Sequence, residues 1–281
     1  MVTAMTETID TPAGPVTYDL RAAAPGAPPL PPLVLLPSGG HDRRDFDELR
    51  EHLVELTTIA VDWPAQNGSA PFATGSASAM RFADLAEALV ARIAPDGAIL
   101  AGNSVGGFAA ARMAIRRPEL VRGLVLIDTG GFSARSPAER VFCALMGRPR
   151  FLRAIYPGFA SAYMRVRTDA DRRARATALA TTREQASLRA LSELWASFAS
   201  PEHDLRARAG DIAAPTLLLW GRRDPVIPLR IARRAHELIA GSRLVVLDAG
   251  HVPHTTDPAG VAEAIRELTA SLAGGSARVA A

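Results

Sequence analysis

Lysine is missing from this chain of 281 residues, so all 32 basic side chains are arginine. The absence excludes P-loop nucleotide-binding proteins, protein kinases and pyridoxal-phosphate enzymes in their usual forms, because each needs a lysine on phosphate or on the cofactor. The 29 acidic residues leave a net charge of only +3, which is weak support for a surface that follows a phosphate backbone. We therefore expect no nucleic-acid partner.

Cysteine is nearly missing as well, since Cys143 is the single cysteine and has no intramolecular disulfide partner. No apolar run approaches the roughly 18 to 20 residues of a membrane span. Residues 1–10 lack the basic start and the apolar stretch of a secretory signal. These features indicate a cytoplasmic protein with no membrane partner.

Short apolar runs alternate with amphipathic helical patterns along most of the chain, after a hairpin over 8–21 that turns at 12–15. The expected strands are 33–37, 57–62, 98–103, 124–128, 216–220 and 244–248, and the expected helices are 45–56, 80–93, 105–117, 229–239 and 258–272. Because the strands are continuously apolar, we predict an α/β fold, a mostly parallel sheet with helices on both faces.

One long segment interrupts this alternation with helical patterns and no convincing strand, which indicates a helical insertion between two strands of one sheet. One of its patterns places Leu188, Leu191, Trp195 and Phe198 on a single helix face. The expected division is a core in two parts, 1–130 and 210–281, with the insertion at 131–209.

The positive charge is concentrated in this insertion. Residues 131–208 hold 14 arginines and 7 acids, a net charge of +7, which leaves a net charge of −4 on the rest of the chain. A basic insertion could steer an anionic substrate toward a site in the core. The alternative is that the arginines are solvated on outer helix faces.

The strongest local motif is the G-x-S-x-G pattern over Gly102 to Gly106, with Ser104 at its centre. An apolar strand precedes it and a helix follows it, which is the setting of a nucleophile elbow. The glycines permit a turn too tight for side chains, so that the serine hydroxyl stands clear at a helix N-terminus. The alternative is a plain strand-to-helix turn rich in glycine and serine.

A serine nucleophile needs a base and an acid that orients the base. His251 and His254 follow the apolar run 244–248, and chemistry in such sheets gathers at the carboxyl ends of strands. The pair lacks a third ligand at usable spacing, so we expect no metal. Asp128 and Asp224 both follow strands, and either could orient the base.

These motifs together resemble the α/β-hydrolase superfamily, from about residue 33 to residue 272. The strand-GNSVGG-helix, WGRRDPVIP and AGHVPH segments follow the order serine, aspartate, histidine. The resemblance implies that Ser104 is the nucleophile, Asp224 the orienting acid and His251 the general base. It places Asp128 where some members carry the acid instead, and it makes the insertion at 131–209 a cap.

The chain departs from the family after its first parallel strand, where members commonly have His-Gly and this sequence has Pro37-Ser38-Gly39-Gly40-His41. The resemblance assigns the amides of Gly39 and Val105 to an oxyanion hole. A backbone amide needs no particular side chain, so the hole can survive this departure.

The expected reaction is acyl transfer to water on a small or medium carboxylic ester, thioester or lactone. We expect Gly40, Trp195 and Val252 to contact this small-molecule substrate, and we expect no cofactor. One alternative is a carbon–carbon-bond hydrolase of ring-cleavage dienoates, with a cap arginine holding the substrate carboxylate; the candidates are Arg148, Arg150, Arg153, Arg165 and Arg167. Another is a non-hydrolytic or binding protein on the same fold.

Overall fold

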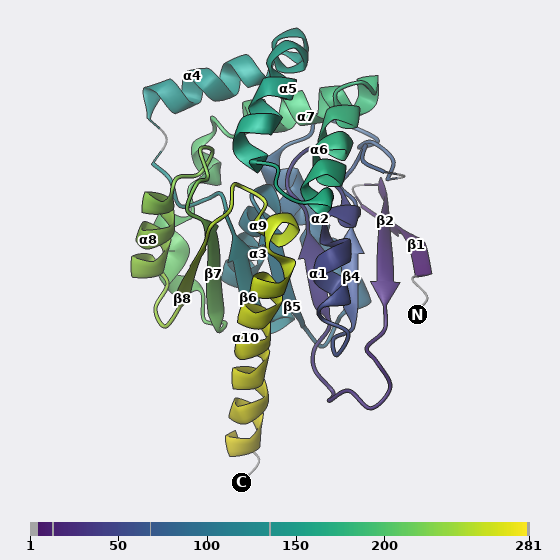
Figure 1. Cartoon of the computed structure of the whole chain (residues 1–281), viewed down its shortest axis with the longest axis vertical. Coiled ribbons are helices and arrows are strands. Elements are labelled where there is room, and N and C mark those ends of the chain that lie inside the picture. Colours follow the sequence, from purple (N-terminus) through teal and green to yellow (C-terminus); the bar gives the residue numbers. More distant parts are fainter. Residues whose placement is uncertain (1–4, 13, 68, 135, 280–281) are drawn as a thin grey trace.

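One sheet of eight strands forms the centre of the molecule (Figure 1). The computed structural model describes residues 5–12, 14–67, 69–134 and 136–279, with side chains described up to residue 272. The strands are β1 (Met5–Thr11), β2 (Gly14–Arg21), β3 (Leu33–Leu36), β4 (Thr58–Val61), β5 (Ala98–Asn103), β6 (Val121–Ile127), β7 (Thr216–Gly221) and β8 (Arg243–Leu247).

The strand order is β1-β2-β4-β3-β5-β6-β7-β8. β1 and β2 form an antiparallel hairpin at one edge, and β2 also runs antiparallel to β4. Every other neighbouring pair is parallel, which confirms the mostly parallel sheet. The predicted hairpin turn at 12–15 includes residue 13, which lies outside the described residues.

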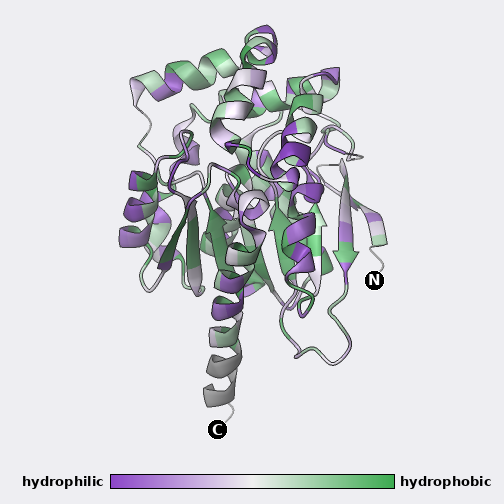
Figure 2. Cartoon of the chain, in the orientation of Figure 1, coloured by the Kyte–Doolittle hydropathy of each residue, from purple (hydrophilic) through white to green (hydrophobic). Residues whose placement is uncertain are grey.

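The two faces of the sheet carry two separate cores. Within β3, Val34 and Leu36 belong to one apolar cluster and Leu33 and Leu35 to the other, as the period of two along a strand requires. The first cluster contains residues of α2 (Ala79–Ile93), α3 (Val105–Arg116) and α8 (Leu229–Leu238), and the second contains residues of α1 (Asp47–Glu51) and α10 (Pro258–Val279). Figure 2 shows hydrophobic strands between these more polar helices.

A helical cap is inserted between β6 and β7, as predicted. Its helices are α4 (Pro137–Met146), α5 (Pro149–Met164), α6 (Asp169–Thr181) and α7 (Gln185–Ser197). They gather at one end of the molecule, at the top of Figure 1. Capping boxes begin α4, between Ser136 and Glu139, and α6, between Thr168 and Asp171. The division of the chain at 131 and 209 remains a prediction.

The helix predicted over 45–56 is wrong in length. A 3₁₀ turn (Arg43–Phe46) leads into α1, which ends at Glu51. Leu53 and Leu56 follow in turns, yet their exposed fractions are 0% and 2%. The apolar spacing therefore indicates which residues are buried, but it does not show that they are helical. The helix ends early because the chain must turn to reach β4.

A short helix that the sequence did not indicate, α9 (Pro253–Thr256), follows His251, and the final helix extends past the predicted end. Within the described part of the chain, no helix combines the length and the apolar character needed to cross a membrane.

Candidate active site

Ser104 stands on a strained turn between β5 and α3. Its φ and ψ are 56° and −112°, a backbone conformation that a non-glycine residue rarely adopts. A Cβ at Gly102 would overlap the backbone of Gly106, and one at Gly106 would overlap the carbonyl of Leu36. The two glycines thus permit the tight turn, and the Ser104 amide donates to the Ile127 carbonyl at 3.0 Å. The result is the exposed-hydroxyl geometry expected of a nucleophile elbow.

A buried hydrogen bond joins His251 to Asp224. Nδ1 of His251 lies 2.7 Å from Oδ2 of Asp224, and the exposed fractions of the two residues are 3% and 5%. The other carboxylate oxygen of Asp224 accepts from the Val226 amide at 2.7 Å, which fixes the carboxylate plane. With Nδ1–H donating to the carboxylate, Nε2 of His251 is left as the basic nitrogen.

Asp128 lies in the same buried cluster but has different partners. Both of its carboxyl oxygens accept from the Gly221 amide, at 3.0 and 3.2 Å. Burial, followed by the neighbouring Asp224 carboxylate, raises the pKa of Asp128 well above that of an ordinary aspartic acid. Of the two aspartates, it is Asp224 that contacts His251.

Asn103, which sequence reasoning passed over, ties the elbow to the histidine loop. Its side-chain amide donates to the carbonyl oxygens of His251 at 2.9 Å and Ile127 at 3.1 Å. The residue is fully buried. The asparagine of the GNS triplet was the available signal, because a buried amide side chain at a strand end needs backbone partners.

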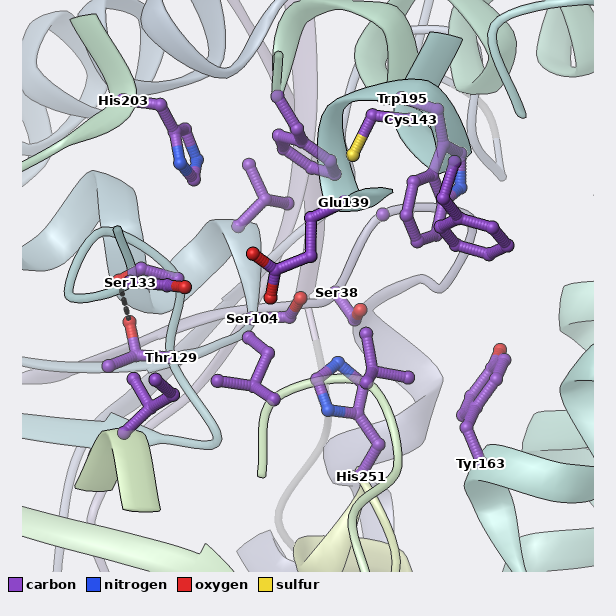
Figure 3. Close-up of a pocket in the computed structure, with 18 of the residues that line it drawn as sticks. Ser38, Ser104, Thr129, Ser133, Glu139, Cys143, Tyr163, Trp195, His203 and His251 are labelled. Atoms are coloured by element: carbon purple, nitrogen blue, oxygen red, sulfur yellow. Dashed lines mark hydrogen bonds between the residues drawn. The ribbon is translucent and has the colours of Figure 1, made fainter. Parts of the chain in front are cut away.

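A cavity of about 420 Å³ lies between the cap and the carboxyl ends of the strands, and its wall includes Ser104 and His251. Figure 3 shows these two side chains facing the same space from different loops. Gly39 and Val105, the expected oxyanion-hole residues, also line it. As the first residue of α3, Val105 has an amide without an acceptor inside the helix. Most of the remaining wall is apolar and comes from the cap, including Phe142, Phe159, Leu191, Leu194, Trp195 and Phe198.

Of the expected substrate contacts, Trp195 lies in the cavity wall but Gly40 and Val252 do not. Val252 is fully buried in the apolar core, and the space beside Gly40 is taken by Tyr156 and Leu191 of the cap. The cap helices pack onto the loop at Gly40, so that Ser38 and Gly39 face the cavity in its place.

Sequence reasoning missed five polar wall residues, Thr129, Ser133, Glu139, His203 and Arg230. In Figure 3 the Glu139 carboxylate reaches from the cap toward Ser104. The expected cap arginines, from Arg148 to Arg167, are not part of the described wall, where the one arginine is Arg230 at the start of α8. A charged residue in a helical pattern gives no sign in the sequence of which side it faces.

His254 is a core residue. Its ring stacks on Phe46 with centroids 4.6 Å apart, and burial lowers its pKa to about 3.

Three other residues come close enough to share a metal ion: Asp128, Asp224 and His251 hold ligand atoms within 4.8 Å of one another. The hydrogen bond between the last two already uses the ring nitrogen that faces this cluster.

The match to a family model decides the relationship: residues 33–264 match the model of the alpha/beta hydrolase family. The chain belongs to this family. It is 29% identical over 256 residues to a pimeloyl-[acyl-carrier protein] methyl ester esterase of Salmonella newport, covering 85% of this chain and 94% of that protein. It is 28% identical over 255 residues to a 2-succinyl-6-hydroxy-2,4-cyclohexadiene-1-carboxylate synthase of Salmonella paratyphi C, covering 87% and 96%.

A longer relative is the biotin biosynthesis bifunctional protein BioHC of Teredinibacter turnerae, 27% identical over 262 residues. The match covers 84% of this chain but only 44% of that protein. Among solved structures, a thermophilic esterase from Thermogutta terrifontis superposes with a TM-score of 0.78 at 23% identity, covering 96% of this chain and 99% of that one. At this identity the likeness shows the shared fold.

Proposed function

We propose that this alpha/beta hydrolase is a serine carboxylic ester hydrolase that works through an acyl-enzyme. The observation that carries the proposal is the buried hydrogen bond between Asp224 and His251, because His251 lines the same cavity as Ser104. A histidine oriented by a carboxylate beside a serine on an elbow is the arrangement that acyl transfer requires.

In the proposed mechanism, Nε2 of His251 takes the Ser104 proton as the hydroxyl oxygen attacks the substrate carbonyl carbon. The amides of Gly39 and Val105 stabilise the oxyanion, and the alcohol leaves with the proton held by His251. Water, deprotonated by the same nitrogen, then attacks the acyl carbonyl; the acyl–Ser104 bond breaks, the acid leaves, and His251 returns the proton to the Ser104 oxygen. Each step moves one proton between His251 and Ser104, the leaving alcohol or water, and no step needs a metal or an organic cofactor.

The substrate class follows from the cavity. A volume of about 420 Å³ with a largely apolar cap wall suits a small or medium acyl chain on an ester, thioester or lactone. The esterase named for the Salmonella newport relative acts on a methyl ester, which supports this class for the present chain. Glu139 in the same cavity wall favours substrates that are neutral near the scissile bond.

A fluorophosphonate probe tests the proposal. It should form an adduct on Ser104, located by peptide mass spectrometry, and Ser104→Ala and His251→Ala should each abolish labelling. The matched control is His236→Ala, because His236 is exposed on α8 and bonds only Ser242 among its described contacts. A folded wild-type protein that neither labels nor hydrolyses p-nitrophenyl esters would exclude a serine hydrolase.

A second candidate is a carbon–carbon-bond hydrolase or a synthase that uses the same residues. Arg230 in the cavity wall could hold a substrate carboxylate, and the likeness to the Salmonella paratyphi C synthase points to chemistry other than ester hydrolysis. Turnover of 2-hydroxy-6-oxo-dienoates in preference to p-nitrophenyl esters would favour it. Arg230→Gln should then raise KM for the dienoate and leave KM for a neutral ester unchanged.

A further inference from the structure

A second hydrogen-bonded chain of side chains lies beside the cavity. Nδ1 of His41 is 2.5 Å from Oδ2 of Asp45, and Nε2 of His41 is 2.7 Å from the Tyr163 hydroxyl. All three residues are buried, with exposed fractions of 1% for His41, 6% for Asp45 and 3% for Tyr163. When Nδ1–H donates to the carboxylate, Nε2 is left to accept from the Tyr163 hydroxyl, so each member has a defined role.

The tyrosine keeps its proton for this bond. Burial raises the pKa of Tyr163 well above the usual tyrosine value, so the hydroxyl remains a donor throughout the neutral range. The other described polar group near it is the Tyr156 hydroxyl, at a longer 3.4 Å. The shorter bond to His41 therefore anchors the Tyr163 hydroxyl.

Tyr163 also holds the proposed catalytic base. Its carbonyl oxygen accepts the His251 amide at 2.8 Å, and its ring meets the His251 imidazole edge-on, with centroids 5.8 Å apart and planes at 85°. A Cβ at Gly250 would overlap the same carbonyl, so the histidine loop lies directly on the tyrosine backbone. In Figure 3, Tyr163 and His251 lie in the same part of the cavity wall.

Through His41, the hydrogen-bonded side chains also reach the loop that carries the expected oxyanion amide. His41 lies two residues after Gly39, and Gly40 between them has φ of +82°. Two adjacent glycines leave this loop with wide backbone freedom. The bond from His41 to Tyr163 spans 122 residues of sequence and attaches the loop to α5 of the cap.

We propose that Asp45, His41 and Tyr163 form a positioning brace that holds the Gly39 loop and the His251 imidazole in register with Ser104. The proposal rests on the proposed function, because its consequence is the rate at which Ser104 is acylated. None of the three takes part in bond making. Their effect comes through placement, where a shift of about 1 Å can cost up to about a hundredfold in rate.

The decisive variant is Tyr163→Phe, which removes one hydroxyl and keeps the ring. We expect kcat for a p-nitrophenyl ester to fall about tenfold, KM to stay within about twofold, and the rate of fluorophosphonate labelling to fall with kcat. The matched control is Tyr18→Phe, since Tyr18 is also buried and its hydroxyl donates to Glu7 in β1, in the hairpin at the sheet edge. It should lower Tm comparably and leave kcat unchanged.

His41→Gln closes a double-mutant cycle with Tyr163→Phe. If the two residues act through one bond, removing the Tyr163 hydroxyl should lower kcat little further in the His41→Gln background. Additive losses, or a kcat for Tyr163→Phe within twofold of wild type, would overturn the brace.

Failure of the proposed function would look different, because the wild-type protein itself would then be inert toward probe and esters. In that case NMR of ¹⁵N-histidine-labelled protein decides on the brace. The His251 imidazole signals should shift or broaden in Tyr163→Phe and not in Tyr18→Phe, and unchanged signals in both would overturn it.

Discussion

Two buried aspartates at neighbouring strand ends show how surroundings assign different chemistry to the same side chain. Asp128 is fully buried with a raised pKa, while Asp224 accepts hydrogen bonds from His251 and from a backbone amide. Burial and the nearby Asp224 carboxylate both disfavour a negative charge on Asp128. Asp224 is therefore placed to orient a base, and Asp128 accepts from the Gly221 amide beside it.

Asparagine at each position should separate these roles. Asp224→Asn should lower kcat for an ester by about 10⁴-fold, because an amide cannot stabilise the protonated His251 or hold its tautomer. Asp128→Asn should lower kcat by less than about tenfold, since the amide oxygen can still accept from the Gly221 amide. Steady-state kinetics of the two variants, with circular dichroism to confirm folding, measures the difference. The reverse ranking would assign the orienting role to Asp128.

At the scale of elements, the site depends on close backbone contact where β5 turns into α3. Gly102 and Gly106 let the strand, the turn and β3 approach until no side chain fits between them. The helix amides then point at the space above Ser104. A glycine in α5, Gly158, has open space around it instead and serves no such contact.

Alanine at two glycines should therefore have opposite effects. Gly102→Ala should lower the free energy of unfolding by about 2–3 kcal/mol or more and abolish labelling of Ser104, because its Cβ meets fixed backbone. Gly158→Ala should raise the free energy of unfolding by about 0.5–1 kcal/mol, as expected when alanine replaces glycine inside a helix. Urea denaturation of both variants checks this; a stable, fully labelled Gly102→Ala protein would contradict the elbow geometry.

Over the whole molecule, ion pairs engage six of the described arginines of the basic cap. Its arginines pair with acids within the cap, as Arg172 does with Asp169, and with acids of the core, as Arg173 does with Glu48. Other such cap pairs involve Arg167, Arg189, Arg206 and Arg208. The charged wall residues of the cavity are one acid, Glu139, and one arginine, Arg230. This distribution gives an anionic substrate little net attraction toward Ser104.

Salt should consequently affect anionic and neutral esters alike. Between about 0.02 and about 0.5 M NaCl, where the screening length shortens several-fold, we expect the ratio of their kcat/KM values to change by less than about twofold. The measurement compares the p-nitrophenyl half-ester of a dicarboxylic acid with the matching neutral ester. A several-fold loss confined to the anionic ester would show that the arginine-rich cap steers substrates.

The sequence by itself determined the parts of this protein that depend on near neighbours in the chain. Continuous apolar runs fixed the parallel strands, since such strands are buried on both faces, and the two glycines around Ser104 marked the elbow, since only they fit its turn. The family resemblance then brought together Ser104, Asp224 and His251. The helix predicted over 45–56 was too long, because buried leucines in the turns after α1 have the same spacing as the buried face of a helix.

Only the tertiary structure decided what depends on packing between distant segments. It showed that His251 bonds Asp224 and that Asp128 bonds the Gly221 amide instead, because both aspartates follow strands and only three-dimensional distance tells them apart. It placed Glu139 and Arg230 in the cavity wall. It also joined His41 to Tyr163, a contact without a local signal, because the direction of each side chain is set by the elements packed around it.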